Sequence, residues 1–480
     1  MTARLFSDQN RAWWTLVAVS FGLFLIMLDN TVVNVALPSI RADLGISVSE
    51  LEWVVNAYAL TFGVLLLTGG KLADLIGRRR IYIAGLLIFT AASLWCGLAG
   101  GASSLIAART IQGIGAALMN PATLSIITAT FPPRQRGTAI GIWAGVSALA
   151  LAIGPLVGGL LTQKINWNWI FFINIPVGIL GVFAARVFID ESKDSSLEQR
   201  LDLPGLITSA LGLFGLTYAL IETNTHAWGS TRVLSLFALA AVSLTAFVIL
   251  EMRQRVPMLD LSLFRNATFS GANTVMGLVG LAMFGIFFYN SLFLQNVLGY
   301  GPIKTGATFL PLTGLIMLVA PIAGRFTDVI GPRWLIAVGM TLLTGSLLLF
   351  ATLDENSSFW NILPGLVLGG LGMAITMAPT TTAAMSSVPV DKAGVGSAVI
   401  NSARQVGGSL GIAIMGTLIA GQVTVSALDP RYPAQYVDGW HRALFVGAAI
   451  LAAGAVVAVF TIRTKRQVEP KAVPELTPTN

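Results

Sequence analysis

Fourteen long stretches with few or no charges follow one another along the 480-residue chain, and they limit the fold more than any other feature of the sequence. A helix of about 20 apolar residues crosses about 30 Å of hydrocarbon, and only helices and closed barrels satisfy their own backbone hydrogen bonds in lipid. Charged residues make up 11% of the chain, against about 25% in globular domains. We therefore predict an all-α integral membrane protein with fourteen transmembrane helices. Their predicted cores are 13–37, 52–70, 81–100, 104–130, 138–162, 168–189, 203–222, 233–251, 269–296, 304–324, 334–353, 359–386, 395–421 and 441–462.

The 29 lysines and arginines predict how the chain crosses the membrane. If the N-terminus is cytoplasmic, twenty-one of them fall in cytoplasmic segments, six in outer loops, and Arg109 and Arg404 within helices. This bias is the positive-inside pattern, so we expect a multi-pass protein of the inner (plasma) membrane with both termini cytoplasmic. The same pattern accounts for the net charge of +7, and it argues against nucleic acid as a partner.

An internal repeat predicts two related halves. GKLADLIGRR (70–79) returns 254 residues later as GRFTDVIGPR (324–333), and GIGAALMNP, ending at Pro121, has a looser counterpart in GLGMAITMAP, ending at Pro379. Repeats of this kind build many transporters. If each half has six helices, spans 7 and 8 are an insert that follows a charged linker. The predicted division is an N-terminal six-helix bundle (1–190), a linker with two inserted helices (191–265), a C-terminal six-helix bundle (266–465) and a cytoplasmic tail (466–480).

The segment GKLADLIGRRR (70–80) is predicted to form a cytoplasmic gate. Gly70 and Gly77 permit close helix contact and a tight turn, and Asp74 can form an ion pair with Arg78 four residues later. Together with Arg79, these residues would hold two helix ends together in one conformation and release them in another. A short basic topology anchor is the simpler interpretation, and the two roles are compatible.

Six segments together resemble the major facilitator superfamily, and in particular its fourteen-span drug:proton antiporters of the EmrB/QacA type. They are LDNTVVNVALP in span 1, GKLADLIGRRR after span 2, RTIQGIGAALMNP in span 4, GPLVGG in span 5, WNWIFFINIPVG opening span 6 and NSARQVGGSLG in span 13. The resemblance extends over about residues 12–465. It implies two six-helix bundles around a central cavity, here with a two-helix insert. One departure is Asn168, where the family usually has a basic residue between two tryptophans.

GPLVGG resembles the antiporter motif of that family, which consists here of Gly154, Pro155, Gly158 and Gly159. In a membrane helix, glycine and proline permit a kink and let backbones approach closely. From the residues alone, an ordinary small-residue helix interface is the preferred interpretation. The resemblance adds the direction of transport, which is export.

Asp29 interrupts an otherwise apolar span, where a carboxylate costs about 2.5–3.5 kcal/mol on insertion scales. Arg109 is expected at matching depth, because the two lie about 13 Å and about 12 Å from the outer surface at 1.5 Å per residue. Desolvation disfavours a charged carboxylate, and a nearby guanidinium favours it. We therefore predict that Asp29 takes a proton when the cavity opens outward and loses it when the cavity opens inward, with Arg109 as its partner. A permanent buried salt bridge is the alternative.

Other polar and aromatic side chains within the spans could line a substrate cavity. Arg404 has no acidic residue in its own helix, and it could meet a carbonyl, a lipid headgroup or an acidic substrate. Glu222 ends span 7 and is expected at the membrane interface more than in a proton relay. Each of the others could equally hold helices together. The full set is Asn34, Asn120, Trp143, Glu222, Phe288, Tyr289, Asn290, Gln295, Asn401, Arg404 and Gln405.

The chain lacks the common signatures of enzymes. Neither GxxxxGK[ST] nor GxSxG occurs, GIGAAL departs from the dinucleotide pattern, and His226 and His441 have no metal-ligand spacing. Cys96 is the only cysteine, which excludes a disulfide framework and a cysteine metal site. We expect no enzyme activity, no metal and no cofactor, and transport energised by ions.

These features predict a proton-coupled antiporter that exports small amphipathic compounds, as in multidrug or antibiotic efflux, by alternating access. Its expected partners are protons, the substrate and membrane lipids, and we expect a monomer. With Asp29 as the sole deep acid, neutral or weakly charged substrates are favoured. The alternatives are a dedicated exporter of one endogenous metabolite and a non-transporting membrane receptor on the same fold.

Overall fold

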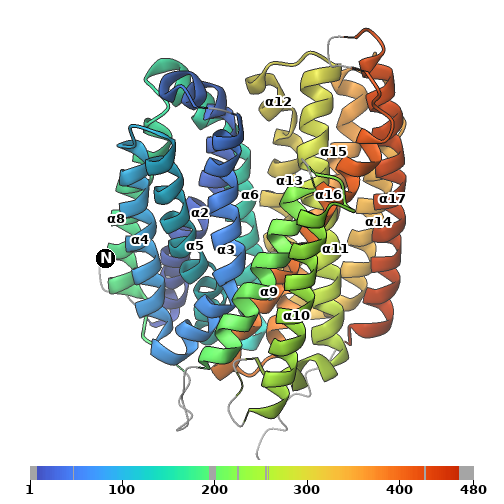
Figure 1. Ribbon diagram of the computed structural model, residues 1–480. Helices are drawn as coiled ribbons and strands as arrows, with labels where there is room; N and C mark the ends of the chain where they lie inside the picture. Colours follow the sequence, from blue (N-terminus) through green and yellow to red (C-terminus); the bar gives the residue numbers. More distant parts are fainter. Residues whose placement is uncertain are drawn as a thin grey trace, which may run out of the picture.

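The structure is a computed structural model that describes residues 8–46, 48–193, 202–223, 226–254, 257, 259–425 and 429–463. Within these ranges every regular element is a helix, and the long helices run side by side (Figure 1). The predicted cytoplasmic tail (466–480) and most of the charged linker (194–201) lie outside the described residues.

The first group of helices, coloured blue to teal in Figure 1, is called the N-terminal lobe here. Glycine and proline residues set several of the boundaries between its apolar helices. Gly77, with a φ of 126°, separates two helices, and Pro132 and Pro133 begin another. The lobe consists of α2 (Asp8–Leu44), α3 (Val48–Ile76), α4 (Arg78–Gly97), α5 (Ala102–Thr130), α6 (Pro133–Lys164), α7 (Trp169–Phe172) and α8 (Asn174–Phe188).

The second group, coloured yellow-green to red in Figure 1, is called the C-terminal lobe. Gly331, with a φ of 85°, separates α13 from α14, as Gly77 separates α3 from α4. The lobe consists of η1 (Leu261–Arg265), α11 (Ala267–Leu292), η2 (Phe293–Val297), α12 (Pro302–Thr308), α13 (Leu310–Ile330), α14 (Pro332–Phe350), α15 (Phe359–Ser386), η3 (Val390–Lys392), α16 (Ala393–Ala420) and α17 (Tyr432–Thr461).

Two helices between the lobes in sequence, α9 (Leu203–Glu222) and α10 (Thr231–Arg253), pair with each other. The side chains of Asp202 and Ser230 cap their first turns by accepting hydrogen bonds from the backbone N–H groups of Gly205 and Val233. α9 also packs against α3 of the N-terminal lobe and α16 of the C-terminal lobe. The pair therefore contacts both lobes, as Figure 1 shows.

Among the described residues, twelve helices are long and apolar enough to cross a membrane, so the predicted count of fourteen is not supported by this criterion. The two predicted spans outside this set, 104–130 and 395–421, correspond to α5 and α16, which have 29 and 28 residues. Both helices are rich in buried small and polar residues; in α5, 18 of the 29 are buried. A helix surrounded by other helices does not need an apolar surface, so its mean hydropathy falls.

Close glycine contacts recur in both lobes. In the N-terminal lobe, a Cβ on Gly85 would lie 2.7 Å from the carbonyl oxygen of Gly115, and in the C-terminal lobe a Cβ on Gly339 would lie 2.9 Å from that of Gly372. Gly85 and Gly339 are 254 residues apart, the same offset as in the sequence repeat. Glycine therefore brings α4 onto α5 and α14 onto α15 in the same way.

Candidate functional site

A buried ion pair joins two helices inside the N-terminal lobe. The Nη1 group of Arg109 on α5 lies 2.5 Å from Oδ2 of Asp29 on α2. Asp29 is 0% exposed and Arg109 is 1% exposed, so neither charge reaches the surface. Each charge depends on the other, because an isolated charge in this environment carries a large desolvation cost.

Gln112 completes the hydrogen bonding of Asp29. Its Nε2 group donates to Oδ1 of Asp29 over 2.9 Å and to the hydroxyl of Ser93 over 2.7 Å, and its Oε1 accepts from Arg109 over 2.6 Å. Nothing in the sequence analysis singled out Gln112. The available signal was its position three residues after Arg109, which places both side chains on one face of α5.

Groups from two further helices contact Arg109. Its Nε donates to the carbonyl oxygen of Val54 over 3.0 Å, and its guanidinium lies 4.3 Å from the ring centre of Tyr58, both on α3. The ring centre of Phe171 on α7 lies 5.9 Å from the same guanidinium. Asn174 of α8 donates a hydrogen bond over 3.0 Å to Ser93 of α4, the residue that also accepts from Gln112. The segment WNWIFFINIPVG thus supports the ion pair from the side.

Asn168, which replaces the basic residue usual in the resembling family, donates from its side chain to the carbonyl oxygen of Gly97 over 2.9 Å. This bond ties the start of α7 to the end of α4. A neutral amide therefore serves as a local helix connection at this position.

The predicted gate segment joins the two lobes. Asp74 at the end of α3 accepts hydrogen bonds from Nε and Nη2 of Arg78 (3.1 and 2.9 Å) and from the backbone N–H groups of Gly394 and Val395 (2.9 and 3.0 Å). These N–H groups belong to the first turn of α16, where a carboxylate is favoured by the helix dipole. Asp74 therefore caps a helix of the opposite lobe.

The other gate residues tighten this contact. Arg78 also donates to the carbonyl oxygens of Val390 and Asp391 (2.5 and 3.2 Å), and a Cβ on Gly70 would lie 2.4 Å from the carbonyl oxygen of Gly394. Gly70 therefore allows α3 and α16 to touch through their backbones.

Glu191, which the sequence analysis did not single out, completes the turn at Gly77. Its carboxylate accepts from the backbone N–H of Arg79 over 3.1 Å and of Arg80 over 3.3 Å, and Nη1 of Arg79 donates to the carbonyl oxygen of Ile189 over 3.2 Å. The chain after α8 is thereby attached to the start of α4.

The second copy of the repeat makes the reciprocal contact. Asp328 on α13 accepts from the backbone N–H groups of Gly137 and Thr138 over 2.8 and 3.0 Å, in the first turns of α6. A Cβ on Gly324 would lie 2.1 Å from the carbonyl oxygen of Gly137. Pro332 occupies the position that Arg78 has in the first copy, so this latch has no arginine. We call these two contacts the first latch (Asp74) and the second latch (Asp328); both lie at the same end of the bundle.

The predicted antiporter motif lies where α6 crosses α2. A Cβ on Gly154 would lie 1.8 Å from the hydroxyl of Thr31, and one on Gly158 would lie 2.9 Å from the carbonyl oxygen of Val32. Gly159 approaches Ile303 of α12, while Pro155, inside α6, lies near Gly306. The motif therefore provides a close small-residue interface within the N-terminal lobe and a contact with the C-terminal lobe.

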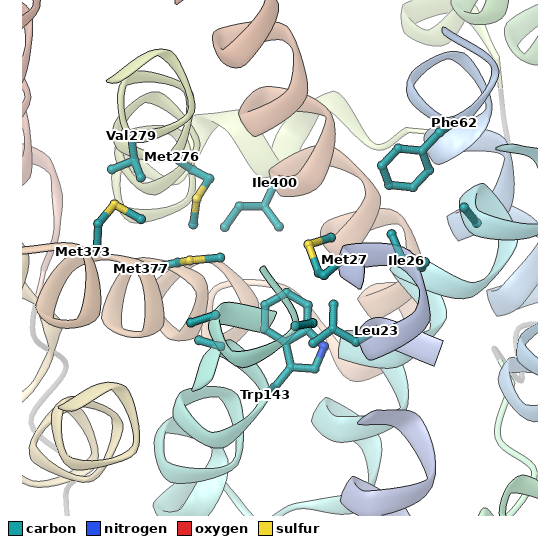
Figure 2. Close-up of a cluster of buried hydrophobic side chains, with 14 of the residues drawn as sticks. Leu23, Ile26, Met27, Phe62, Trp143, Met276, Val279, Met373, Met377 and Ile400 are labelled. Atoms are coloured by element: carbon teal, nitrogen blue, oxygen red, sulfur yellow. The ribbon is translucent and has the colours of Figure 1, made fainter. Parts of the chain in front are cut away.

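A small cavity lies between the lobes. It is lined from the N-terminal lobe by Leu124 and Trp143, and from the C-terminal lobe by Met276, Met377, Thr381, Ile400, Asn401 and Arg404. Three of the predicted cavity residues, Trp143, Asn401 and Arg404, thus share one site. Figure 2 shows a cluster of buried hydrophobic side chains that includes four of these lining residues, Trp143, Met276, Met377 and Ile400, with Met27 of α2 close by. These methionines were not among the predicted cavity residues.

The structure disperses the remaining predicted cavity residues. Asn290 lines a second cavity with Trp440 inside the C-terminal lobe, Tyr289 donates to the carbonyl oxygen of Ile412, and Asn120 is buried with no hydrogen-bond partner for its side chain. Gln405 is half-buried on α16, and Asn34, Phe288 and Gln295 are exposed. None of these seven lines the cavity between the lobes.

Glu222 lies away from the cavity, at the end of α9. Its carboxylate pairs with Arg232 over 2.8 Å and lies 3.0 Å from the ring of His226. Both partners belong to the connection between α9 and α10. The structure therefore places Glu222 at the end of the inserted pair, and it is not among the residues that line the cavity between the lobes.

Two groups of membrane helices, held together at one end by paired latches and enclosing buried charges and a cavity, define an integral membrane transporter. The model of the Major Facilitator Superfamily matches residues 19–412, and the chain belongs to that family. It is a multi-pass membrane transporter and not an enzyme.

Named relatives include resistance and export proteins. The chain is 36% identical to the tetracenomycin C resistance and export protein of Streptomyces glaucescens, over 86% of this chain and 77% of the relative. It is 38% identical to the puromycin resistance protein pur8 of Streptomyces alboniger, over 89% and 86%. It is 35% identical to the multidrug resistance protein Stp of Mycobacterium tuberculosis, over 95% and 84%.

Among solved structures, the fold is similar to that of the human organic anion transporter MFSD10 (TETRAN), with a TM-score of 0.66 over 93% of this chain and 99% of that one. The two sequences are 12% identical, so this similarity concerns the fold alone.

Proposed function

We propose that this protein is a proton-coupled antiporter of the inner (plasma) membrane that exports small amphipathic compounds, including antibiotics and other drugs. The observation that carries the proposal is the fully buried contact of Asp29 with Arg109 and Gln112. A carboxylate in this position changes its affinity for a proton when its cationic partner moves. The names of the three relatives, which are resistance or export proteins, support efflux.

The proposed topology has fourteen crossings, as in the EmrB/QacA type. α5 and α16, which have 29 and 28 residues, would be about 44 and 42 Å long and would cross the membrane within the bundle. With the twelve more apolar helices they give two six-helix bundles (1–190 and 266–465) and an insert (191–265). Both termini are then cytoplasmic, as the positive-inside pattern predicts. The functional unit is a monomer.

The latches suggest how proton binding is coupled to movement. In the structure, both latches are formed, so the end that would face the cytoplasm is closed. Opening it requires Asp74 to leave the first turn of α16 and Asp328 to leave the second turn of α6. The pseudo-symmetric lobes can make this change as rigid bodies around the central cavity. Asp29 would be protonated while the empty transporter returns to the inward-open conformation, and it would release the proton there before substrate is exported.

The cavity walls favour amphipathic substrates of varied shape. Met276 and Met377 have flexible, polarisable side chains, which adapt to irregular ligands, and Trp143 offers a flat apolar surface. Thr381 and Asn401 add polar groups that can orient a ligand.

Proteoliposomes that contain a trapped pH-sensitive dye test the proposal. Addition of puromycin or tetracenomycin C to the wild-type protein should dissipate an imposed pH gradient. Asp29→Asn should abolish this flux, because the amide cannot carry a proton, while ligand binding remains. Asp438→Asn, which changes an exposed carboxylate on α17, is the matched control and should behave as the wild type.

Other outcomes would contradict the proposal. Proton-coupled export that is unchanged in Asp29→Asn would remove Asp29 from the mechanism. Ligand binding without any proton flux in the wild type would identify a receptor on this fold. Flux with one metabolite of a broad panel, and with none of the drugs, would identify a dedicated exporter.

A further inference from the structure

Arg404 lies near the middle of α16 with its charge buried between the lobes. It is 6% exposed, and it stands about 17 Å from the start of a helix about 42 Å long. Its Nη2 group donates to Oδ1 of Asn401 over 3.0 Å, whereas its Nε group is buried with no hydrogen-bond partner. In the part of the chain that the structure describes, none of the ion pairs includes Arg404.

The contrast with Arg109 shows what Arg404 lacks. Arg109 is equally deep, but its guanidinium has the carboxylate of Asp29, the carbonyl oxygen of Val54 and the side chain of Gln112 as partners. A buried charge without a counter-ion carries a desolvation cost that only an opposite charge or several hydrogen bonds can offset. Arg404 has one neutral partner, so its hydrogen-bonding capacity is largely unused.

Helix packing fixes the position of this unused charge. A Cβ on Gly280 of α11 would lie 2.2 Å from the carbonyl oxygen of Arg404, and a Cβ on Gly407 would lie 2.0 Å from that of Gly277. The backbones of α11 and α16 therefore touch on both sides of Arg404. The helix cannot rotate to carry the guanidinium out of the bundle without breaking these contacts.

Arg404 shares its cavity with apolar side chains from both lobes. Trp143 and Leu124 face it from the N-terminal lobe, and Met276, Met377 and Ile400 surround it in the C-terminal lobe. Figure 2 shows most of these apolar groups converging on one region. The lining residues include no aspartate or glutamate. The site therefore combines one fixed positive group with an adaptable apolar surface.

We propose that Arg404 binds the negatively charged group of an amphipathic substrate, so that carboxylates and related organic anions form a substrate class of this transporter. A planar guanidinium with free N–H groups matches a carboxylate, while the methionines and Trp143 accept the apolar part of the molecule. The inference rests on the proposed function, since it assigns a ligand to the same cavity. It adds organic anions to the expected neutral or weakly charged substrates, an expectation that rested on Asp29 as the sole deep acid.

Two compounds with the same apolar part test the inference: pyrenebutyrate, which is a carboxylate, and pyrenebutyramide, which is its neutral amide. Their dissociation constants are measured by equilibrium dialysis with the full-length protein in lipid nanodiscs at neutral pH, against empty nanodiscs. The wild-type protein should bind the carboxylate at least about tenfold more tightly than the amide, as expected for a charge-assisted hydrogen bond. In Arg404→Gln this ratio should fall to about one, because the carboxylate loses affinity and the amide does not.

Three controls make the result decisive. Arg265→Gln removes an exposed arginine and the same net charge, and it should keep the wild-type ratio. Arg404→Lys keeps the charge but loses the forked geometry, and it should keep part of the ratio. Size-exclusion chromatography and amide binding show whether Arg404→Gln folds. If it does not, the ratio of carboxylate to amide affinity in the wild type and in Arg404→Lys tests the inference.

Equal affinity for the two compounds in the wild type, or an unchanged ratio in Arg404→Gln, would overturn the inference. Displacement of pyrenebutyrate when sodium chloride is added to a chloride-free zwitterionic buffer would make Arg404 an inorganic-anion site and overturn the inference as well. Failure of the antiport proposal is a separate result. It appears as the absence of proton flux when the neutral amide is added, and this measurement does not depend on binding of a charged group by Arg404.

Discussion

Asp29 divides its hydrogen bonds between two residues of one helix, Arg109 and Gln112, which stand three positions apart on α5. Arg109 supplies charge, and Gln112 supplies a donor that also reaches Ser93. Replacing the amide with an apolar group would leave Oδ1 of Asp29 and the Ser93 hydroxyl without this donor. Both groups are buried, so water cannot take its place without rearrangement.

We therefore predict that Gln112→Leu lowers the free energy of unfolding by about 1–3 kcal/mol, the cost of leaving buried polar groups unsatisfied. Thermal unfolding in detergent micelles measures this, and Gln135→Leu, at an exposed position near the start of α6, is the control. Equal unfolding temperatures for Gln112→Leu and the control would show that the amide does not support the pair.

Individual residues differed in how well the sequence could identify them. Asp29 was found because a carboxylate in an apolar span is costly, and its depth then pointed to Arg109. Gln112 and the cavity methionines gave no such signal, because an amide in a helix usually serves packing and methionine in an apolar span looks like any lipid-facing residue. For Glu222, the interfacial interpretation agrees with its contacts to Arg232 and His226.

At the scale of elements, the two latches have the same geometry but different chemistry. Both aspartates accept hydrogen bonds from two successive backbone N–H groups of a helix in the opposite lobe, in the first turn of α16 for Asp74 and in the second turn of α6 for Asp328. Only Asp74 also neutralises a buried arginine, since Arg78 is 1% exposed and the second copy has Pro332 at the equivalent position. Removing the charge of Asp74 leaves the buried Arg78 without its counter-ion. Removing the charge of Asp328 leaves no buried arginine unpaired, because this latch has no arginine.

Asp74→Asn should therefore destabilise the protein by about 3–5 kcal/mol, the cost of an uncompensated buried charge. Asp328→Asn should cost about 1 kcal/mol, since asparagine can still accept a hydrogen bond from these N–H groups and no buried charge is left unpaired. Thermal unfolding of both variants in micelles, with Asp438→Asn as the control, measures the difference. Equal losses for the two latch variants would contradict the asymmetry.

The helices themselves illustrate what hydropathy can and cannot decide. Sequence patterns indicated α5 and α16 as spans because charges are rare in them. Neither helix, however, is apolar enough to be counted among the twelve candidate spans. Their polar residues include Arg109, Gln112 and Arg404, all of which face other helices. The two helices that carry these buried polar groups are thus the ones whose composition departs furthest from a lipid-facing span.

For the whole molecule, the repeat in sequence predicted two related halves, and its glycines, Gly70 and Gly324, lie at the contacts with Gly394 and Gly137 between the lobes. What the sequence could not supply was which side chains from the two lobes meet in the cavity. That requires the relative placement of α5 and α6 against α11, α15 and α16, which depends on many weak packing contacts at once.

The charge of the substrate sets how strongly the membrane voltage drives the whole transport cycle. If one proton enters for one neutral amide, a single charge moves, and 100 mV supplies about 2.3 kcal/mol, or about a fiftyfold gradient. If one proton enters for one carboxylate, two charges move, and the limiting gradient becomes about two-thousandfold. Proteoliposomes with a potassium diffusion potential and no pH gradient should accumulate pyrenebutyrate with twice the voltage sensitivity of pyrenebutyramide. Asp29→Asn should accumulate neither, and equal voltage sensitivity for the two compounds would exclude export of the anionic form.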